Sequence, residues 1–180
     1  MIFNKGKTGI WLAAGGGLLL GVILVLGAEE VDRATSTQAF CTGACHSMKV
    51  HVAESPYYQQ SVHRSTPTGV VADCGDCHIP DALIPATWVH IESGIHDIYA
   101  TLVRDLDTPE QWAARRPVLT ERARQWFRDT DSGTCRHCHQ RDAIQPRSQA
   151  GRTMHAVAQQ NNMTCIECHT NLVHPPAGNP

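Results

Sequence analysis

All eight cysteines of the chain fall in four short motifs, and each motif is followed directly by a histidine. Three motifs read C-x-x-C-H, and their residues are Cys74, Cys77 and His78; Cys135, Cys138 and His139; and Cys165, Cys168 and His169. The first motif, Cys41-Thr-Gly-Ala-Cys45-His46, holds one extra residue between its cysteines. C-x-x-C-H is the attachment signal for c-type haem, in which the histidine binds the iron. The sequence therefore predicts four covalently bound c-type haems.

Other uses of paired cysteines explain this pattern less well. Four disulfides would also consume eight cysteines, but a disulfide does not require a histidine after every pair. A structural zinc ion would need two pairs and would leave the histidines unexplained. Four haems in a chain of 180 residues predict a protein that moves electrons.

The haem motifs form two pairs, and each pair contains a further histidine at a matching position. His63 lies 17 residues after His46, and His155 lies 16 residues after His139. This similarity indicates two duplicated dihaem units. Iron in such carriers is commonly held between two histidines, so the candidate distal ligands are His63, His155 and, five residues after His169, His174.

Three distal histidines for four haems leave one haem unusual, and the stretched first motif marks it. Met48 lies two residues after His46, and methionine is an established haem ligand that raises the potential. A methionine buried beside a porphyrin would look the same in the sequence. His51, five residues after His46, repeats the spacing of His169 and His174 and is a rival ligand.

An uncharged stretch at residues 8–28 separates the N-terminus from the haem motifs. At about 1.5 Å per residue, its 21 residues span the ~30 Å hydrocarbon core of a bilayer. A cleaved signal peptide is the alternative, but its apolar region is usually about 7–15 residues long. Lys5 and Lys7 precede the stretch, so the positive-inside rule places the N-terminus in the cytoplasm. We therefore expect residues 1–28 to form a cytoplasmic N-terminus and transmembrane anchor, and residues 29–180 to form a periplasmic haem domain.

Composition and periodicity predict the fold class. The formal net charge of −2 suggests no nucleic-acid partner. We expect a mainly α fold with extensive loops: one N-terminal transmembrane helix plus a small multihaem cytochrome c domain whose core is the porphyrins themselves. We expect residues 110–128 to form a helix that is interrupted near Pro117.

Residues 86–103 have the periodicity of an amphipathic helix, with His90, Gly94 and Asp97 on one face. A glycine between the other two lets a flat molecule approach the helix, and His90 and Asp97 could accept two protons from a quinol. The alternative is a helix that packs on haems with its polar face in water. Because only twelve residues separate Ala28 from Cys41, the first haem must lie near the membrane, where it would meet a quinol first.

Several of these motifs together resemble the NapC/NirT/NrfH family of membrane-anchored tetrahaem cytochromes c. They are the anchor, the sequence Cys45-His46-Ser47-Met48, the stretch Cys-Gly-Asp-Cys-His-Ile-Pro from Cys74, and Thr-Cys-Ile-Glu-Cys-His followed by Val-His-Pro. The resemblance covers nearly the whole chain. It implies a quinol dehydrogenase in the bacterial inner membrane that passes electrons to a periplasmic redox enzyme.

The resemblance also implies an assignment of iron ligands. His78 and His155 would hold the second haem, His139 and His174 the third, and His169 and His63 the fourth. Met48 would bind the first haem, with Asp97 on its distal side. His90 stands where the nitrite-reductase-linked branch is expected to carry a catalytic lysine.

The partners implied are a membrane quinone or quinol, the lipid bilayer and a periplasmic nitrite-, nitrate- or hydroxylamine-handling multihaem protein; a homo-oligomer is left open. Three alternative functions remain. The same chain could run toward quinone reduction, accepting electrons from a hydroxylamine-oxidising enzyme. It could be an electron wire without a quinone site, or a reductase of a small nitrogen oxide at an open first haem.

Overall fold

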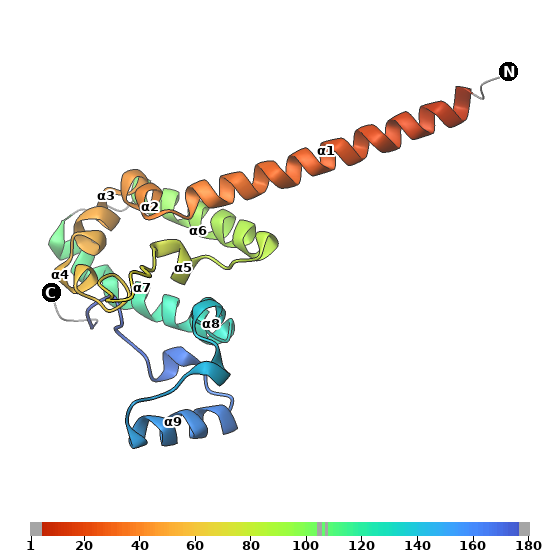
Figure 1. Cartoon of the computed structure of the whole chain (residues 1–180). Coiled ribbons are helices and arrows are strands. Elements are labelled where there is room, and N and C mark those ends of the chain that lie inside the picture. The colour runs from red at the N-terminus through yellow and green to blue at the C-terminus, as the bar shows by residue number, and fades with distance from the viewer. Residues whose placement is uncertain (1–4, 104–105, 107, 177–180) are drawn as a thin grey trace.

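The computed structural model describes residues 5–103, 106 and 108–176, and within them the chain forms helices and loops but no strand. This confirms the mainly α, loop-rich fold (Figure 1). The α-helices are α1 (Lys5–Thr35), α2 (Gln38–Ala44), α3 (His46–Met48), α4 (Pro56–Gln59), α5 (Cys74–His78), α6 (Leu83–Val103), α7 (Pro109–Asp129), α8 (Gly133–Cys138) and α9 (Gln149–Gln160). A π-helical turn spans Lys49–Ala53, and 3₁₀ turns span Arg141–Ala143 and Cys165–Glu167.

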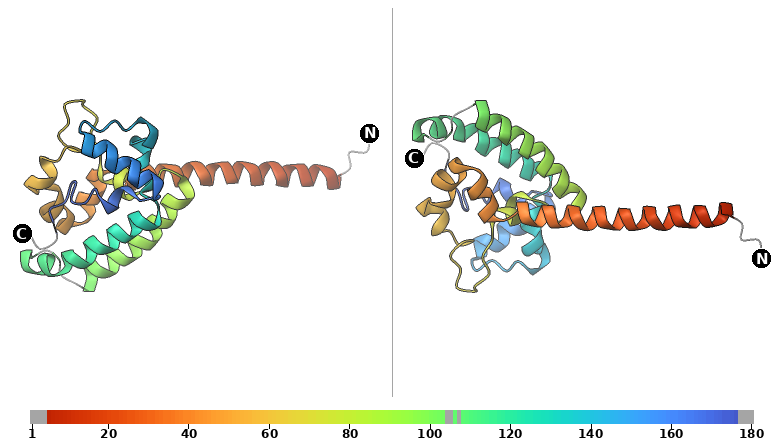
Figure 2. Two further views of the ribbon diagram at one scale, coloured as in Figure 1. Left: turned by 90° about the horizontal axis from the view of Figure 1, so that it is seen from below. Right: turned by 90° about the horizontal axis from the view of Figure 1, so that it is seen from above.

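Helix α1 projects from the body of the molecule, with the N-terminus at its far end (Figure 2). Its segment Gly9–Thr35 contains an 18-residue window with a mean hydropathy of 2.3, and by length and composition it is able to cross a membrane. The helix continues past residue 28 to Thr35, supported by the Glu30–Arg33 ion pair one turn apart. Its last turns contact α6, so the anchor helix is also part of the haem domain's framework.

Helices α6 and α7 lie side by side in both views of Figure 2. Arg122 on α7 and His96 on α6 join them by a 2.8 Å hydrogen bond. The helix predicted for residues 86–103 is confirmed as α6, but the predicted interruption of the next helix is wrong. Pro117 lies inside a continuous α7, because a proline removes one backbone hydrogen bond and can bend a helix without ending it.

The domain has almost no protein core of its own. Among the described residues, the buried apolar ones are only Ala53, Tyr58 and Ala86. Instead, a cavity of about 4000 Å³ runs through the domain, lined by all four haem motifs. Because a site for a single drug-sized ligand measures about 300–1,000 Å³, this cavity has room for several large apolar groups. The residues present therefore fit four haems, which would supply the missing core.

Candidate haem and quinol sites

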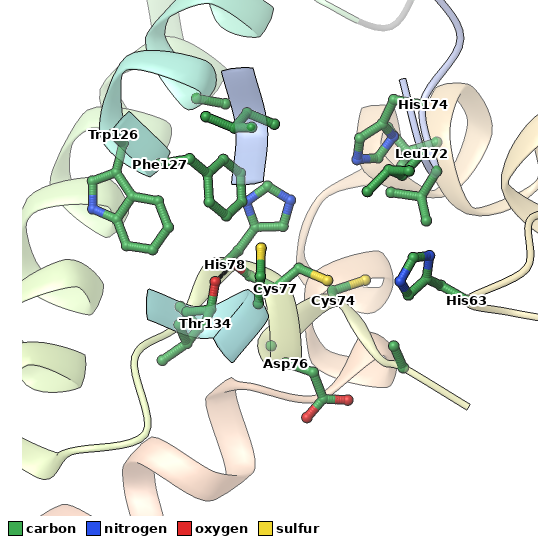
Figure 3. Close-up of a pocket in the computed structure, with 18 of the residues that line it drawn as sticks. His63, Cys74, Asp76, Cys77, His78, Trp126, Phe127, Thr134, Leu172 and His174 are labelled. Carbon is green, nitrogen blue, oxygen red and sulfur yellow. Dashed lines mark hydrogen bonds between the residues drawn. The ribbon is translucent and has the colours of Figure 1, made fainter. Parts of the chain in front are cut away.

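The second haem motif illustrates how the sequence builds each attachment point. The Asp73 side chain caps α5 by accepting a hydrogen bond from the Cys74 amide at 2.7 Å. The Asp76 side chain in turn accepts a hydrogen bond from the Asp73 amide. One helical turn then places Cys74, Cys77 and His78, at positions i, i+3 and i+4, on the same face. In Figure 3 the two sulfurs and the His78 ring face the same space, with His174 and His63 across it.

Six histidine rings form three pairs in the cavity. The ring centroids of His78 and His174 are 6.2 Å apart, those of His63 and His139 are 6.0 Å apart, and those of His155 and His169 are 5.9 Å apart. Two imidazoles that bind opposite sides of one iron, at about 2 Å per bond, place their ring centres about 6 Å apart. Each pair thus combines one motif histidine with one distal candidate at a ring separation that one iron could bridge.

The neighbouring rings are combined differently from the ligand pairs that the resemblance implied, which remain a prediction. His78 lies opposite His174 rather than His155, His139 opposite His63 rather than His174, and His169 opposite His155 rather than His63. The reason lies in the short connections of the C-terminal half. Helix α9 carries its histidine to the motif that directly follows it, while the last loop turns back to α5.

Several contacts prepare these rings for metal binding. His155 Nδ1 lies 2.8 Å from the Gly151 carbonyl oxygen, which holds the ring and leaves Nε2 available. The ring of His78 is open to the cavity but lies deep in the molecule, and this burial lowers its pKa. Burial, reinforced by His78 and Arg116, lowers the pKa of His174 to about 4. Both rings are therefore held neutral, which is the form that binds metals.

The four attachment sites follow one another in sequence order. The Cys41 and Cys74 side chains form a hydrogen bond that lowers the pKa of Cys41 to about 7, so the first and second sites adjoin. Thr134 donates to the Cys77 carbonyl oxygen at 2.8 Å, linking the second and third sites. The Ile166 amide donates to Ser132 Oγ at 3.3 Å, linking the third and fourth. An electron entering at the first site can thus pass along the series.

At the first site, the sequence left two candidate ligands, Met48 and His51. Met48 ends α3, two residues after His46, and lines the cavity. The rival candidate His51 stacks on Trp112, with ring centroids 5.1 Å apart and planes inclined by 9°. His51 also lines the cavity, and this stacking gives it a role in joining the first site to α7.

The structure places His90, Gly94 and Asp97 on α6, where all three line the cavity. The seven residues from His90 to Asp97 correspond to about 10.5 Å of helix rise, so the two side chains do not touch but can bind opposite ends of one molecule. A Cβ built on Gly94 meets no atom within 4 Å, so the space before it is open. Burial raises the pKa of Cys45, and the nearby Asp97 carboxylate raises it further, which places Asp97 beside the first motif.

Two residues of this site were not anticipated from the sequence. Asp32 and Thr35, on the last turns of α1, contact the two nitrogens of His90: Asp32 Oδ1 lies 3.0 Å from Nδ1, and Thr35 Oγ1 lies 3.1 Å from Nε2. The Glu30 to Arg33 spacing, which continues the helix beyond the uncharged stretch, was the signal that could have placed them near α6.

Comparisons with known proteins agree with this architecture. The NapC/NirT cytochrome c family, N-terminal region, matches residues 4–178. TorC, a cytochrome c-type protein of Escherichia coli (strain K12), is 38% identical over 162 residues, which are 88% of this chain but 40% of TorC. A tetraheme cytochrome c-type protein of Nitrosomonas europaea is 38% identical over 174 residues, 95% of this chain and 70% of that protein. NirT, a denitrification system component of Stutzerimonas stutzeri, is 32% identical over 165 residues, 88% of this chain and 78% of NirT.

No solved structure matches this chain. The chain spans about two fifths of the length of TorC. The match to the family model nevertheless includes α1, all four haem motifs and every paired histidine. The chain therefore belongs to the NapC/NirT family and is a membrane-anchored multihaem cytochrome c of electron transport, with covalently bound haem c.

Proposed function

We propose that this protein is a quinol dehydrogenase: it oxidises a membrane quinol beside the first haem and passes the electrons to a periplasmic redox enzyme. The observation that carries the proposal is the placement of His90 and Asp97. They lie on one face of α6 and line the cavity; His90 contacts the anchor helix, and Asp97 lies near the first haem motif. This arrangement suits a molecule that carries a hydroxyl group at each end of its ring, as a quinol does, and that enters from the bilayer.

The proposed ligands follow the observed ring pairs: His78 with His174, His139 with His63, and His169 with His155. Met48 would bind the first iron. Haems held by these residues would supply one-electron redox chemistry, and the adjoining sites would let the electrons of the quinol move along the series. The protein's own residues would take the protons, with His90 and Asp97 each accepting one of the two.

The proposed orientation follows from the positive-inside rule, because Lys5 and Lys7 precede the apolar segment of α1. The haem domain would then lie in the periplasm of an inner-membrane protein. The fourth haem site, at α9, is farthest along the series from α1 and is the proposed exit to a partner. One relative is a denitrification system component, so a nitrogen-oxide-handling enzyme is the proposed class of partner.

Replacing the two proposed proton acceptors tests this function. The Asp97→Leu and His90→Leu variants should each reduce the rate of quinol-driven haem reduction by about 10²-fold or more, since each removes one acid–base group. Dithionite should still reduce all four haems in both variants. Wild-type rates in both variants would place quinol oxidation elsewhere.

A further inference from the structure

His90 contacts the anchor helix through both nitrogens of its ring. The side chains of His90 and Asp32 are only 24% and 22% exposed, and Nδ1 and Oδ1 lie 3.0 Å apart. Nδ1 forms its hydrogen bond with the Ala86 carbonyl oxygen at 3.1 Å, and Asp32 Oδ1 is buried beside it without a hydrogen bond from any described residue. On the other side of the ring, Thr35 Oγ1 lies 3.1 Å from Nε2 and 2.8 Å from the Val31 carbonyl oxygen, so its single hydrogen can be donated to one or the other. In a protonated ring, Nε2 would have Thr35 as its acceptor, and Nδ1 would have the Ala86 carbonyl oxygen with the Asp32 carboxylate beside it.

Asp32 also lies between two spaces. It lines the large cavity together with Thr35 and His90. It lines a second hollow of about 520 Å³ as well, whose walls come from the end of α1, from α5 and from the loop before α6. His90 lines only the large cavity. Asp32 is thus the acidic group through which a proton from His90 could reach the second hollow.

Four of the five other charged groups that line this hollow have partners named in the structure. Arg33 pairs with Glu30 at 3.3 Å, and Asp81 pairs with His137 at 2.9 Å. Asp73 accepts from the Gln38 amide at 2.9 Å, and Asp76 accepts from the Asp73 amide at 2.7 Å. Glu29, one turn before Asp32, lines the same hollow without a contact to His90.

We propose that Asp32 is a positioning residue that acts through His90 and forms the outlet by which one quinol proton leaves the site for the second hollow. This inference rests on the proposed function. The quinol O–H bond breaks and its proton passes by the Thr35 hydroxyl to Nε2, while the Nδ1 proton moves to the Asp32 carboxylate. Bound oxidised haems would supply the oxidant that takes the two electrons, and Asp32 would then release its proton outward.

The test compares Asp32→Asn with the matched control Glu29→Gln in the full-length holoprotein. We expect Asp32→Asn to slow quinol-driven haem reduction by about 10²-fold, with unchanged binding of a non-oxidisable quinone analogue and complete reduction by dithionite. Glu29→Gln should keep the wild-type rate. In Asp32→Ala, which leaves room for a small acid, added formate should restore part of the rate and acetamide should not.

The outcomes separate this inference from the proposed function. If Asp32→Asn and Asp32→Ala oxidise quinol at the wild-type rate, the relay is overturned while the proposed function stands. A loss that formate does not restore, or that Glu29→Gln shares, would overturn it too, because a merely structural role would have that effect. If the wild-type protein does not oxidise quinol, the proposed function fails and the relay fails with it.

Discussion

At the scale of single residues, the distances between histidine rings determine what the domain can bind. The motif histidines and distal candidates could be predicted from the sequence, because C-x-x-C-H spacing and the internal repeat are local patterns. Their pairing could not, because it depends on how α9 and the last loop return to the earlier motifs. Asp32 was missed for the same reason: its contact with His90 joins residues 58 positions apart in the chain.

The pairing of His174 with His78 can be tested in a background that lacks the second haem. In the Cys74→Ala/Cys77→Ala variant, a further His174→Met change should leave the potentials of the remaining three haems unaltered, because its partner site is already empty of iron. His63→Met in the same background should raise one potential, since methionine ligation favours the reduced iron. Redox titration followed by absorbance measures both. A raised potential with His174→Met would instead support pairing with His139.

Met48 provides a second prediction at this scale. Met48→His should lower the potential of the first haem by tens to hundreds of millivolts, within the ~0.8 V range over which axial ligands tune haem iron. His51→Gln, the control, should change that potential little, since His51 stacks on Trp112. The same shift in His51→Gln and none in Met48→His would reverse the assignment.

At the scale of elements, α6 is the helix on which the proposed chemistry depends. Its periodicity predicted both its existence and the face that carries His90, Gly94 and Asp97. The continuity of α7 through Pro117 was not predictable from local sequence, since the helix is held in place by neighbours such as His96 on α6. A glycine in the middle of α6 is locally unfavourable, and the open space before it offers a reason for its presence.

Two substitutions of Gly94 test its effect on stability and its effect on quinol binding separately. Gly94→Ala should stabilise the holoprotein by up to about 1 kcal/mol, because alanine favours the helix and its Cβ meets no neighbour. Gly94→Trp should fill the space before the helix and raise the KM for quinol at least tenfold while haem content stays complete. Thermal unfolding and steady-state kinetics measure the two effects. An unchanged KM in Gly94→Trp would show that quinol does not approach this face.

At the scale of the whole molecule, the domain depends on its cofactors for a core. With three buried apolar residues among those described, burial of protein against protein contributes little stability. A chain produced without haem attachment should therefore show no cooperative thermal transition outside α1. Circular dichroism and limited proteolysis of residues 36–180 made with and without haem attachment would check this. A haem-free domain that resists protease and unfolds cooperatively would contradict it.

The order of the four sites gives the molecule a direction in space, from the anchor helix to α9 (Figure 1). The central claim is that electrons enter at the anchor end from a quinol. Its most direct test is anaerobic mixing of the purified full-length protein with a reduced quinol analogue, with haem reduction and proton release recorded together. We predict that two quinols reduce all four haems and release four protons. Haems that dithionite reduces fully, but that quinol leaves oxidised with no proton release, would contradict the account.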